Sequence, residues 1–252
     1  MIDNKIPVQL TREQAYFREI SFFEYKNICK MLMSDEIEDI NNCLEYIISE
    51  NVTASKELNI IDKFKCIIAI RNTVLGKEAV FLNDGKQMSI DLAIIADKKF
   101  KNDDIIYDIL TLSSPVNFYA KSYDEYIAQC LVEIRGTDVT DLSIEQKKQL
   151  LGETSLSITD IYKTVFSIFK GRDIEIFKDL RINIYSQEYI LQFLKNILYE
   201  DLFALLNFEY ICVRNLNFKS EDFKNYTYPE LKIFLNHLNK EREEQNKSMS
   251  EK

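Results

Sequence analysis

Few side chains in this sequence have the type and spacing that catalysis requires. His237 is the only histidine, so metal sites built on two or more histidines are excluded, and a serine or cysteine nucleophile would depend on this residue. It lies on an expected helix near the C-terminus, where a structural role is favoured. Asp103 and Asp104 are the most obvious acidic pair; a magnesium site is conceivable there, but a solvated turn fits the pattern better. We therefore predict that the chain is not an enzyme and holds neither a metal nor a cofactor.

The cysteines do not form a redox or metal-binding pattern. They are odd in number and widely spaced, with no CxxC, which supports neither a zinc site nor a redox dithiol. Most lie in apolar helical runs, where a free cysteine packs as a small hydrophobe. The five are Cys29, Cys43, Cys66, Cys130 and Cys212.

Phosphate-binding and nucleic-acid-binding signals are also weak. Neither GxxxxGK nor GxGxxG occurs, and the formal net charge of −9 disfavours nucleic-acid binding. The densest basic cluster, Lys98 to Lys101, is more typical of a hairpin edge that resists aggregation. No apolar run approaches the length of a membrane span. We predict no nucleic-acid partner and no membrane association.

The first third of the chain has the pattern of three helices. Ser21 with Glu24 forms a capping box before an apolar helical repeat. Asp35 is the expected cap of a second helix, and a third is expected from Ile60 to Leu75. Gly76 follows, where a positive φ would end that helix.

A small antiparallel sheet of three or four strands is expected next. Ala79–Leu82 and Met88–Ile95 flank Asn83-Asp84-Gly85, which is a hairpin signal. Two further β-rich runs are Ile105–Leu112 and Val116–Ala120.

The rest of the chain is expected to be helical. The longest predicted helix, from Ser186 to Leu206, is apolar over more than half its circumference, so it needs cover on two sides. It is either the central core helix or partly an interface with another subunit. The other predicted helices run from Ser122 to Arg135, from Ser143 to Gly152, from Thr159 to Lys170, and from Thr227 to about Leu238.

These patterns predict an α+β fold that is predominantly α-helical. N-terminal helices and a small antiparallel β-sheet, residues 1–120, are followed by a helical C-terminal half, residues 121–238, with the boundary near Lys121. Residues 239–252 form a polar tail that we expect to be flexible. On the interface alternative, exposed aromatic residues are the expected contacts. They are Tyr189, Phe193, Phe203, Tyr210 and Phe234.

Two segments of the sequence carry a family resemblance. The first comprises Phe17–Lys26 with the helix pair after it and then Leu58–Gly76. The second begins at Ser122, includes Ile134-Arg135-Gly136, and closes with Tyr185–Glu244. Together they resemble the baseplate hub subunit family of T-even-type contractile-tailed bacteriophages. The tryptophan and the histidine-rich patch associated with the family are absent here. Either a subunit of the mature hub or a related factor that assists hub or tape-measure assembly is therefore implied.

The resemblance implies a structural or assembly role without enzymatic activity. The implied partners are other baseplate hub or tail proteins, with a homo-oligomer as a further option. The implied location is the host cytoplasm during assembly, or the tail baseplate of the virion. By resemblance, Arg18 and Arg71 would brace the N-terminal helices against the sheet through ion pairs. A metal-dependent nuclease and an unrelated adaptor are the weaker alternatives.

Overall fold

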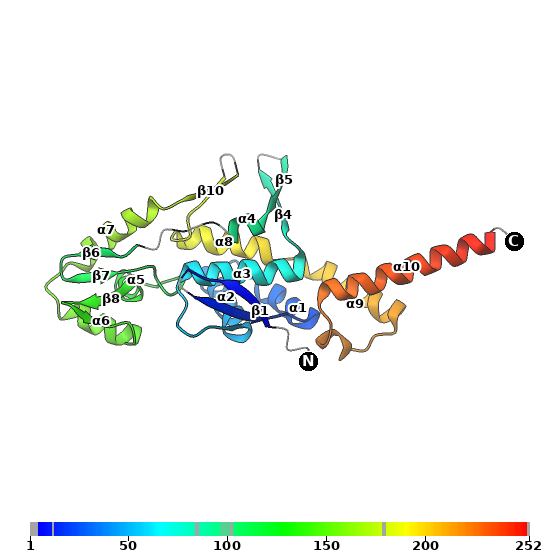
Figure 1. The fold of residues 1–252 in the computed structure, drawn as a ribbon, viewed down its shortest axis with the longest axis horizontal. Coiled ribbons are helices and arrows are strands. Elements are labelled where there is room, and N and C mark those ends of the chain that lie inside the picture. Colours follow the sequence, from blue (N-terminus) through cyan, green and yellow to red (C-terminus); the bar gives the residue numbers. More distant parts are fainter. Residues whose placement is uncertain are drawn as a thin grey trace.

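The computed structural model of the chain is elongated, with a central helical body and a smaller lobe at each end (Figure 1). Helices of the body surround the main core, while the two lobes lie at opposite ends of the long axis. The structure describes residues 5–11, 13–83, 86–96, 98, 100, 103–177 and 180–250. The body helices are α1 (Phe22–Met31), α2 (Ile37–Asn51), α3 (Ile60–Leu75) and α8 (Gln187–Leu198).

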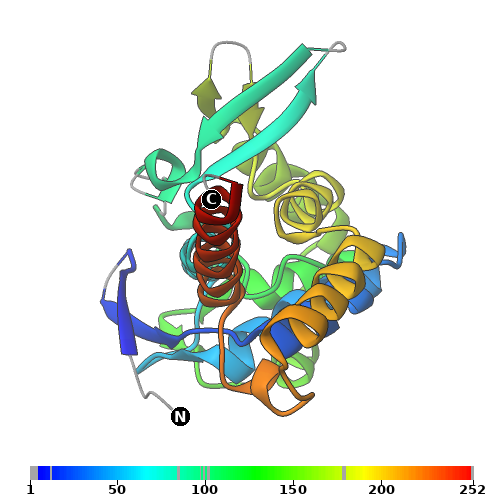
Figure 2. The ribbon, with the colours of Figure 1, turned by 90° about the vertical axis from the view of Figure 1, so that its right-hand side faces the viewer.

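The predicted fold class is confirmed: the described chain is mostly helical, with small antiparallel sheets. One sheet joins β1 (Lys5–Gln9), β2 (Gln14–Arg18) and β3 (Val52–Thr53). A second, of four strands, joins β6 (Ile105–Tyr107), β7 (Leu110–Leu112), β8 (Leu131–Ile134) and β9 (Thr137–Asp138). The two-stranded hairpins are β4 (Glu78–Asn83) with β5 (Lys86–Asp91), and β10 (Ile174–Phe177) with β11 (Leu180–Ile182). Both hairpins project from the same side of the body (Figure 2).

The N-terminal helices form largely as their capping residues predict. Ser21 and Glu24 make the predicted capping box of α1, and the φ of Gly76 after α3 is 85°, a conformation that glycine adopts without strain. The cap assigned to Asp35 is wrong, because the N-cap of α2 is Glu36, which makes no side-chain capping bond. Asp35 instead accepts a hydrogen bond from Lys195 of α8 at 2.7 Å.

Helix α3 is the central helix of the body. It lies against α2 and α8, and its buried residues cover every side of the helix. A helix that is apolar all round belongs in a core, and this position was one of the two expected for the segment from Ser186 to Leu206. The ring of Phe64 on α3 contacts the ring of Phe193 on α8, with centroids 6.3 Å apart.

The strand assignments are correct only in part. The β4–β5 hairpin forms as predicted, although Asp84 and Gly85 of its turn lie outside the described residues, as do Lys99 and Lys101 of the basic cluster. Strand β5 gives way to α4 (Leu92–Ala96) instead of continuing to Ile95.

The second β-rich region folds differently from the prediction. Residues 105–112 form a tight hairpin that turns at Asp108, whose φ is 51°. Residues 116–120 form no strand, and the third strand of the sheet, β8, comes from the segment predicted to be helical.

The helix predicted from Ser122 to Arg135 is wrong beyond Cys130. Helix α5 (Tyr123–Cys130) ends there because residues 131–134 pair as β8 with β7. Arg135 and Gly136, with φ values of 52° and 81°, then form the two-residue turn to β9. The sheet thus joins segments on both sides of Lys121. Helices α6 (Ile144–Gly152) and α7 (Ile158–Lys170) complete this lobe near their predicted positions.

The long helix predicted from Ser186 to Leu206 is also wrong, because the chain breaks between α8 and α9 (Leu202–Leu216). The last carbonyls of α8 are satisfied by side chains from elsewhere in the body. Tyr25 donates to the Leu198 carbonyl at 3.0 Å, and Arg71 donates to the Ile197 carbonyl at 3.1 Å. Carbonyls at a helix C-terminus need such partners, and Asp201 then caps α9 by accepting from the Phe203 amide.

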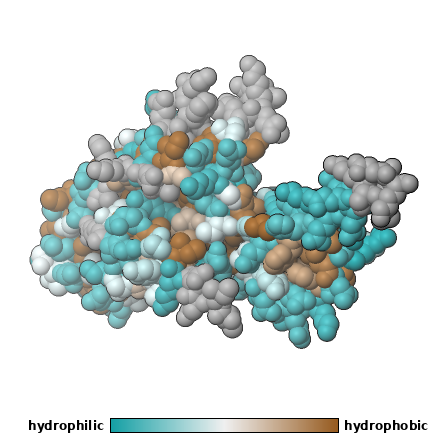
Figure 3. All heavy atoms as spheres, turned by 45° about the vertical axis from the view of Figure 1, so that its right-hand side comes forward, coloured by the Kyte–Doolittle hydropathy of each residue, from teal (hydrophilic) through white to brown (hydrophobic). Residues whose placement is uncertain are grey.

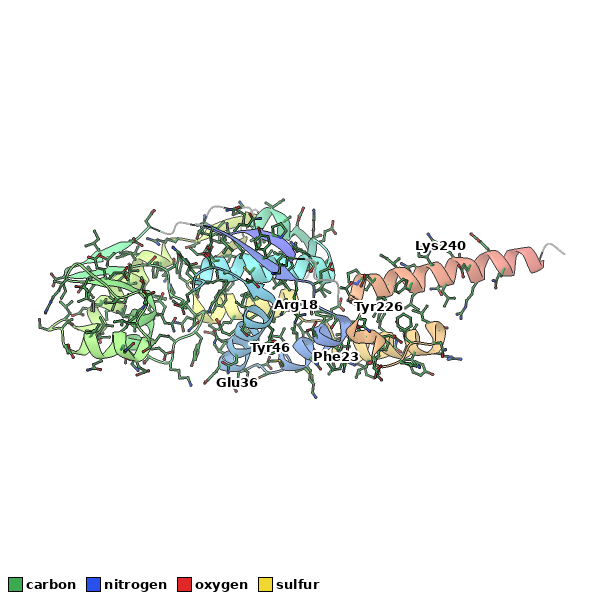
Figure 4. The ribbon with its side chains drawn as sticks, turned by 60° about the horizontal axis from the view of Figure 1, so that its bottom comes forward. Arg18, Phe23, Glu36, Tyr46, Tyr226 and Lys240 are labelled. Carbon is green, nitrogen blue, oxygen red and sulfur yellow. The ribbon has the colours of Figure 1, made fainter. Side chains whose placement is uncertain are left out.

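Helices α9 and α10 (Tyr228–Ser250), with the short helix η1 (Asp222–Lys224), make the C-terminal lobe. An aromatic cluster joins this lobe to α1, since the buried ring of Phe22 lies 5.4–5.6 Å from the rings of Phe208, Phe223 and Tyr228. Figure 4 shows Lys240 on the part of α10 that projects beyond the body. The helix extends to Ser250, well past Leu238, through residues with favourable helix propensity.

Candidate protein-interaction surface

Four exposed apolar side chains follow one side of α9, and we call them the α9 stripe. They are Phe203, Leu206, Tyr210 and Val213, which are 77%, 47%, 60% and 44% exposed. Their spacing of three, four and three residues places them on one side of a helix. Apolar residues at this spacing are the ones that a helix uses to pack against another helix.

The opposite side of α9 is buried in the protein itself. Leu205 and Cys212 are fully buried, and Phe208 packs against Phe22. The helix is therefore apolar both toward the core and toward solvent. A helix that is hydrophobic on all sides is usually buried, whereas the described residues cover only one side of α9.

The position of the α9 stripe is fixed by contacts that α9 makes outside the stripe. Glu209 accepts a hydrogen bond from Lys26 of α1 at 2.5 Å, and both side chains are largely buried. Asp201 fixes the first turn, and Asn217 ends the helix with a φ of 57°. The stripe is thus presented by a rigid element and not by a loop.

The α9 stripe is uncharged along its length. Asn207 and Arg214 lie along one flank, and both are exposed, while Glu209 lies along the other flank. In the view of Figure 3, hydrophobic surface appears on the C-terminal lobe below the hydrophilic surface of α10. Uncharged apolar surface with a polar border is characteristic of protein–protein contact sites.

The five aromatic residues predicted as contacts do not form one surface. Phe203 and Tyr210 lie in the α9 stripe. Phe193 is an incorrect assignment, because it is 7% exposed and packs against Phe64 in the core. Tyr189 is on α8, where its hydroxyl donates to the Arg181 carbonyl.

Phe234 belongs to a separate aromatic cluster of the C-terminal lobe. On α10, it packs against Tyr226 and Phe218 with ring centroids 5.3 and 6.2 Å away. This cluster holds the connection between α9 and α10 against α10 itself. Only part of the Phe234 ring reaches solvent, which leaves α9 with the larger exposed apolar surface.

Arg18 and Arg71 have different roles. Arg18 on β2 forms a two-pronged ion pair with Glu24 on α1, at 2.7 and 3.1 Å, and also donates to the Glu50 carbonyl of α2. This arrangement joins the sheet to two helices. Arg71 makes no ion pair in the described structure, so the prediction that it forms one was incorrect. It is buried and donates to the carbonyls of Ile197, Gly76 and Glu78, and burial lowers its pKa.

The Arg18–Glu24 pair predicts a dependence of stability on pH. Burial raises the pKa of the Glu24 carboxyl, but hydrogen bonds from Arg18 and Ser21 outweigh it and hold this pKa below its usual value of 4.5. A carboxyl with a lowered pKa stabilises the fold above the unfolded-state pKa, and this contribution is lost as the pH falls through the folded-state pKa. Because the two side chains are 40% and 34% exposed, we expect about 1 kcal/mol or less.

Glu24→Gln isolates this effect, because glutamine at the same position also completes a capping box. We expect Glu24→Gln to have a lower free energy of unfolding than the wild type. The difference should be nearly constant between about pH 5 and about pH 7. The difference should shrink below about pH 4. Urea unfolding at several pH values measures it, and a difference that persists unchanged to about pH 3 would contradict the role of the carboxylate charge.

The residues with catalytic potential are dispersed or inert. Burial raises the pKa of the Cys43 and Cys66 thiols to about 12, which suppresses the reactive thiolate. Asp103 and Asp104 are exposed, as is His237 on α10. Among the residues that the structure describes, no group of three or more histidine, cysteine, aspartate or glutamate side chains could hold a metal ion.

A cavity of about 360 Å³ lies beside the C-terminal end of α7. The Asn183 amide in its wall donates to the Phe169 and Lys170 carbonyls, so it caps α7 and holds the next segment in place. The cavity is lined by Phe166, Lys170, Asp173, Asn183, Tyr185 and Ser186. These residues present no nucleophile paired with a base.

Comparisons with protein-family models, curated proteins and solved structures found no significant match to this chain. Within the described part of the chain, no helix combines the length and the apolar character that a membrane crossing requires. Helix α9, which is apolar over much of its surface, has 15 residues.

Two residues of the α9 stripe, Leu206 and Val213, were not among the predicted contacts. Their signal is the three-four-three spacing with Phe203 and Tyr210. The helix predicted from Ser186 ended at Leu206, so Tyr210 and Val213 lay beyond it and the repeat was not recognised. The placement of Leu205 on the inner side was correct, since this residue is fully buried.

Proposed function

We propose that this protein is a non-catalytic structural or assembly component of a bacteriophage tail baseplate hub, acting through protein–protein contacts. The observation that supports the contact role is the α9 stripe, an uncharged apolar surface on a rigid helix. The phage context rests on the resemblance of Phe17–Lys26, Leu58–Gly76 and Tyr185–Glu244 to the hub family. The proposed partners are other hub or tail proteins, encountered in the host cytoplasm during assembly.

A hub subunit and a non-virion assembly chaperone would use the same surface. They differ in their fate, because a subunit stays in the finished particle and a chaperone leaves it. Mass spectrometry of purified virions of the phage that encodes this chain separates the two. We propose the subunit role first, and absence of the chain from particles that contain the other hub proteins would assign the chaperone role.

Phe203→Asp tests the use of the α9 stripe. A tagged chain expressed in cells infected with that phage should co-purify with hub or tail proteins, whereas the Phe203→Asp chain should not. A charge placed within an apolar contact is left without a partner, which typically weakens binding by about 2 kcal/mol or more, roughly 30-fold. Quantitative mass spectrometry of the purified material measures the loss.

The matched control is Ile106→Asp, which places the same charge at an 81% exposed residue on β6, far from α9. Both variants should keep the circular dichroism spectrum and melting temperature of the wild type, because both side chains are exposed. If Phe203→Asp recovers as much tail protein as Ile106→Asp does, the role of the stripe is refuted. Recovery of no tail protein with the wild type would refute the proposed function.

A further inference from the structure

The α9 stripe has the positions of a coiled-coil seam. Phe203, Leu206, Tyr210 and Val213 occupy alternating first and fourth positions of two successive heptads. Such a seam is complementary to another helix with the same spacing. Because none of the four side chains is charged, two copies of this seam can meet without placing like charges face to face.

The residues that border the seam carry opposite charges at matching positions. Glu209 immediately precedes Tyr210, and Arg214 immediately follows Val213. When two identical helices pair in parallel, the residue just before the first position of a heptad in one helix faces a particular residue of the other helix. That residue lies five positions further along the sequence. Glu209 of each copy would therefore face Arg214 of the other.

Both charged groups can still form this ion pair between the two copies. Arg214 is exposed, and no hydrogen bond or ion pair to it occurs within the described residues. Glu209 accepts from Lys26 through Oε2, and a carboxylate accepts several hydrogen bonds. In the antiparallel pair that places Phe203 opposite Val213, by contrast, Glu209 would lie next to Glu209 of the other copy, which is repulsive.

We propose that the α9 stripe pairs in parallel with the α9 stripe of a second copy of the chain, giving a two-fold dimer. This inference rests on the proposed function of the stripe as a docking surface and names its occupant. The dimer is then the unit that other proteins recruit.

The size of the seam sets the expected strength of the dimer. Helix α9 has 15 residues and provides two heptads, so its buried area falls below the roughly 1,200–2,000 Å² that stable complexes bury. The dimer should therefore form and dissociate with concentration. Sedimentation equilibrium should show the average mass rising from 29.7 kDa toward twice that value. We expect the rise between about 1 μM and about 0.5 mM, the range of weak affinities.

A single cysteine placed in the seam reports the orientation. In a parallel pair each seam residue faces the same residue of the other copy. Oxidised glutathione should therefore convert Leu206→Cys to a disulfide-linked protein dimer, which a non-reducing gel detects. Ala204→Cys is the matched control, since Ala204 is exposed on the same helix but off the seam. We expect it to cross-link at least ten times more slowly. The five native cysteines are buried and should not contribute.

The outcomes are decisive in both directions. Concentration-dependent dimerisation that Phe203→Asp abolishes, with cross-linking through Leu206→Cys, supports the proposal. A monomeric mass across the whole range overturns it, as does cross-linking that is as fast through Ala204→Cys. The wild type could prove monomeric while Phe203→Asp still abolishes co-purification with tail proteins. This pair of results would show that a helix of another protein occupies the stripe. That result would leave the proposed function intact, whereas a dimer that recovers no tail protein would refute the proposed function alone.

Discussion

Phe22→Ala should lower the free energy of unfolding by about 3–5 kcal/mol, the usual cost of removing a fully buried phenylalanine ring. Phe22 is fully buried and contacts Phe208, Phe223 and Tyr228, one from each element of the C-terminal lobe. The loss should therefore fall mainly on the attachment of this lobe to α1. Urea unfolding measures the free energy, and limited proteolysis with mass spectrometry locates the loosened segment.

Tyr46→Ala is the control for this change. Tyr46 on α2 is 46% exposed, so its truncation should change the free energy of unfolding by less than about 0.5 kcal/mol. In Phe22→Ala, cleavage should begin between residues 199 and 227, ahead of cleavage in the body. Equal protection of that segment in the wild type and in Phe22→Ala would contradict the role of the aromatic cluster as the attachment.

Arg71→Ala should be comparably destabilising, at about 3–5 kcal/mol, for a different reason. The substitution removes a buried cation that donates to three main-chain carbonyls, those of Ile197, Gly76 and Glu78. Buried acceptors left without donors keep their full cost of desolvation. The carbonyls belong to the end of α8, the turn after α3 and the start of β4, so all three should loosen together. Hydrogen exchange of the amides around these segments measures the effect.

Arg71→Lys distinguishes charge from geometry. A lysine keeps the positive charge, but its single ammonium cannot reach three carbonyls in different directions as a guanidinium does. We expect it to recover less than half of the stability lost in Arg71→Ala. Recovery to the wild-type value would show that the charge alone suffices at the C-terminal end of α8. Arg214→Ala, measured in dilute solution, controls for the loss of an exposed arginine.

The elements that could be predicted from the sequence are those whose signals are local. The capping box of Ser21 and Glu24 lies within four residues, and the apolar repeat of α3 lies within sixteen. Both α6 and α7 also begin next to their own serine caps, Ser143 and Ser157. In these segments the local pattern and the tertiary structure agree, and the fold class follows from them.

The elements that could not be predicted depend on distant partners. Residues 131–134 become β8 because β7, which lies earlier in the chain at Leu110–Leu112, offers an open edge. The break after α8 depends on Tyr25 and Arg71, which are 173 and 126 residues away from the carbonyls that they satisfy. Neither contact leaves a mark in the local sequence.

The candidate site shows the same limit. Large exposed aromatic residues can be guessed from composition, and Phe203 and Tyr210 do lie exposed on α9. Phe193 could not be separated from them, because its burial depends on Phe64 of α3. The seam became visible only when α9 proved to extend to Leu216, because the predicted helix ended at Leu206, before Tyr210 and Val213.

The contacts of α1 also determine when this protein can finish folding during its synthesis. Phe22, Tyr25 and Lys26 are made well before the residues against which they pack, which are Tyr228, Leu198 and Glu209. A ribosome adding about 5–20 residues per second needs roughly 10–40 s to travel from one set to the other. Throughout that interval the aromatic face of α1 lacks the partners that cover it in the folded protein. The packing of α1 is therefore completed only after the C-terminal lobe has been synthesised.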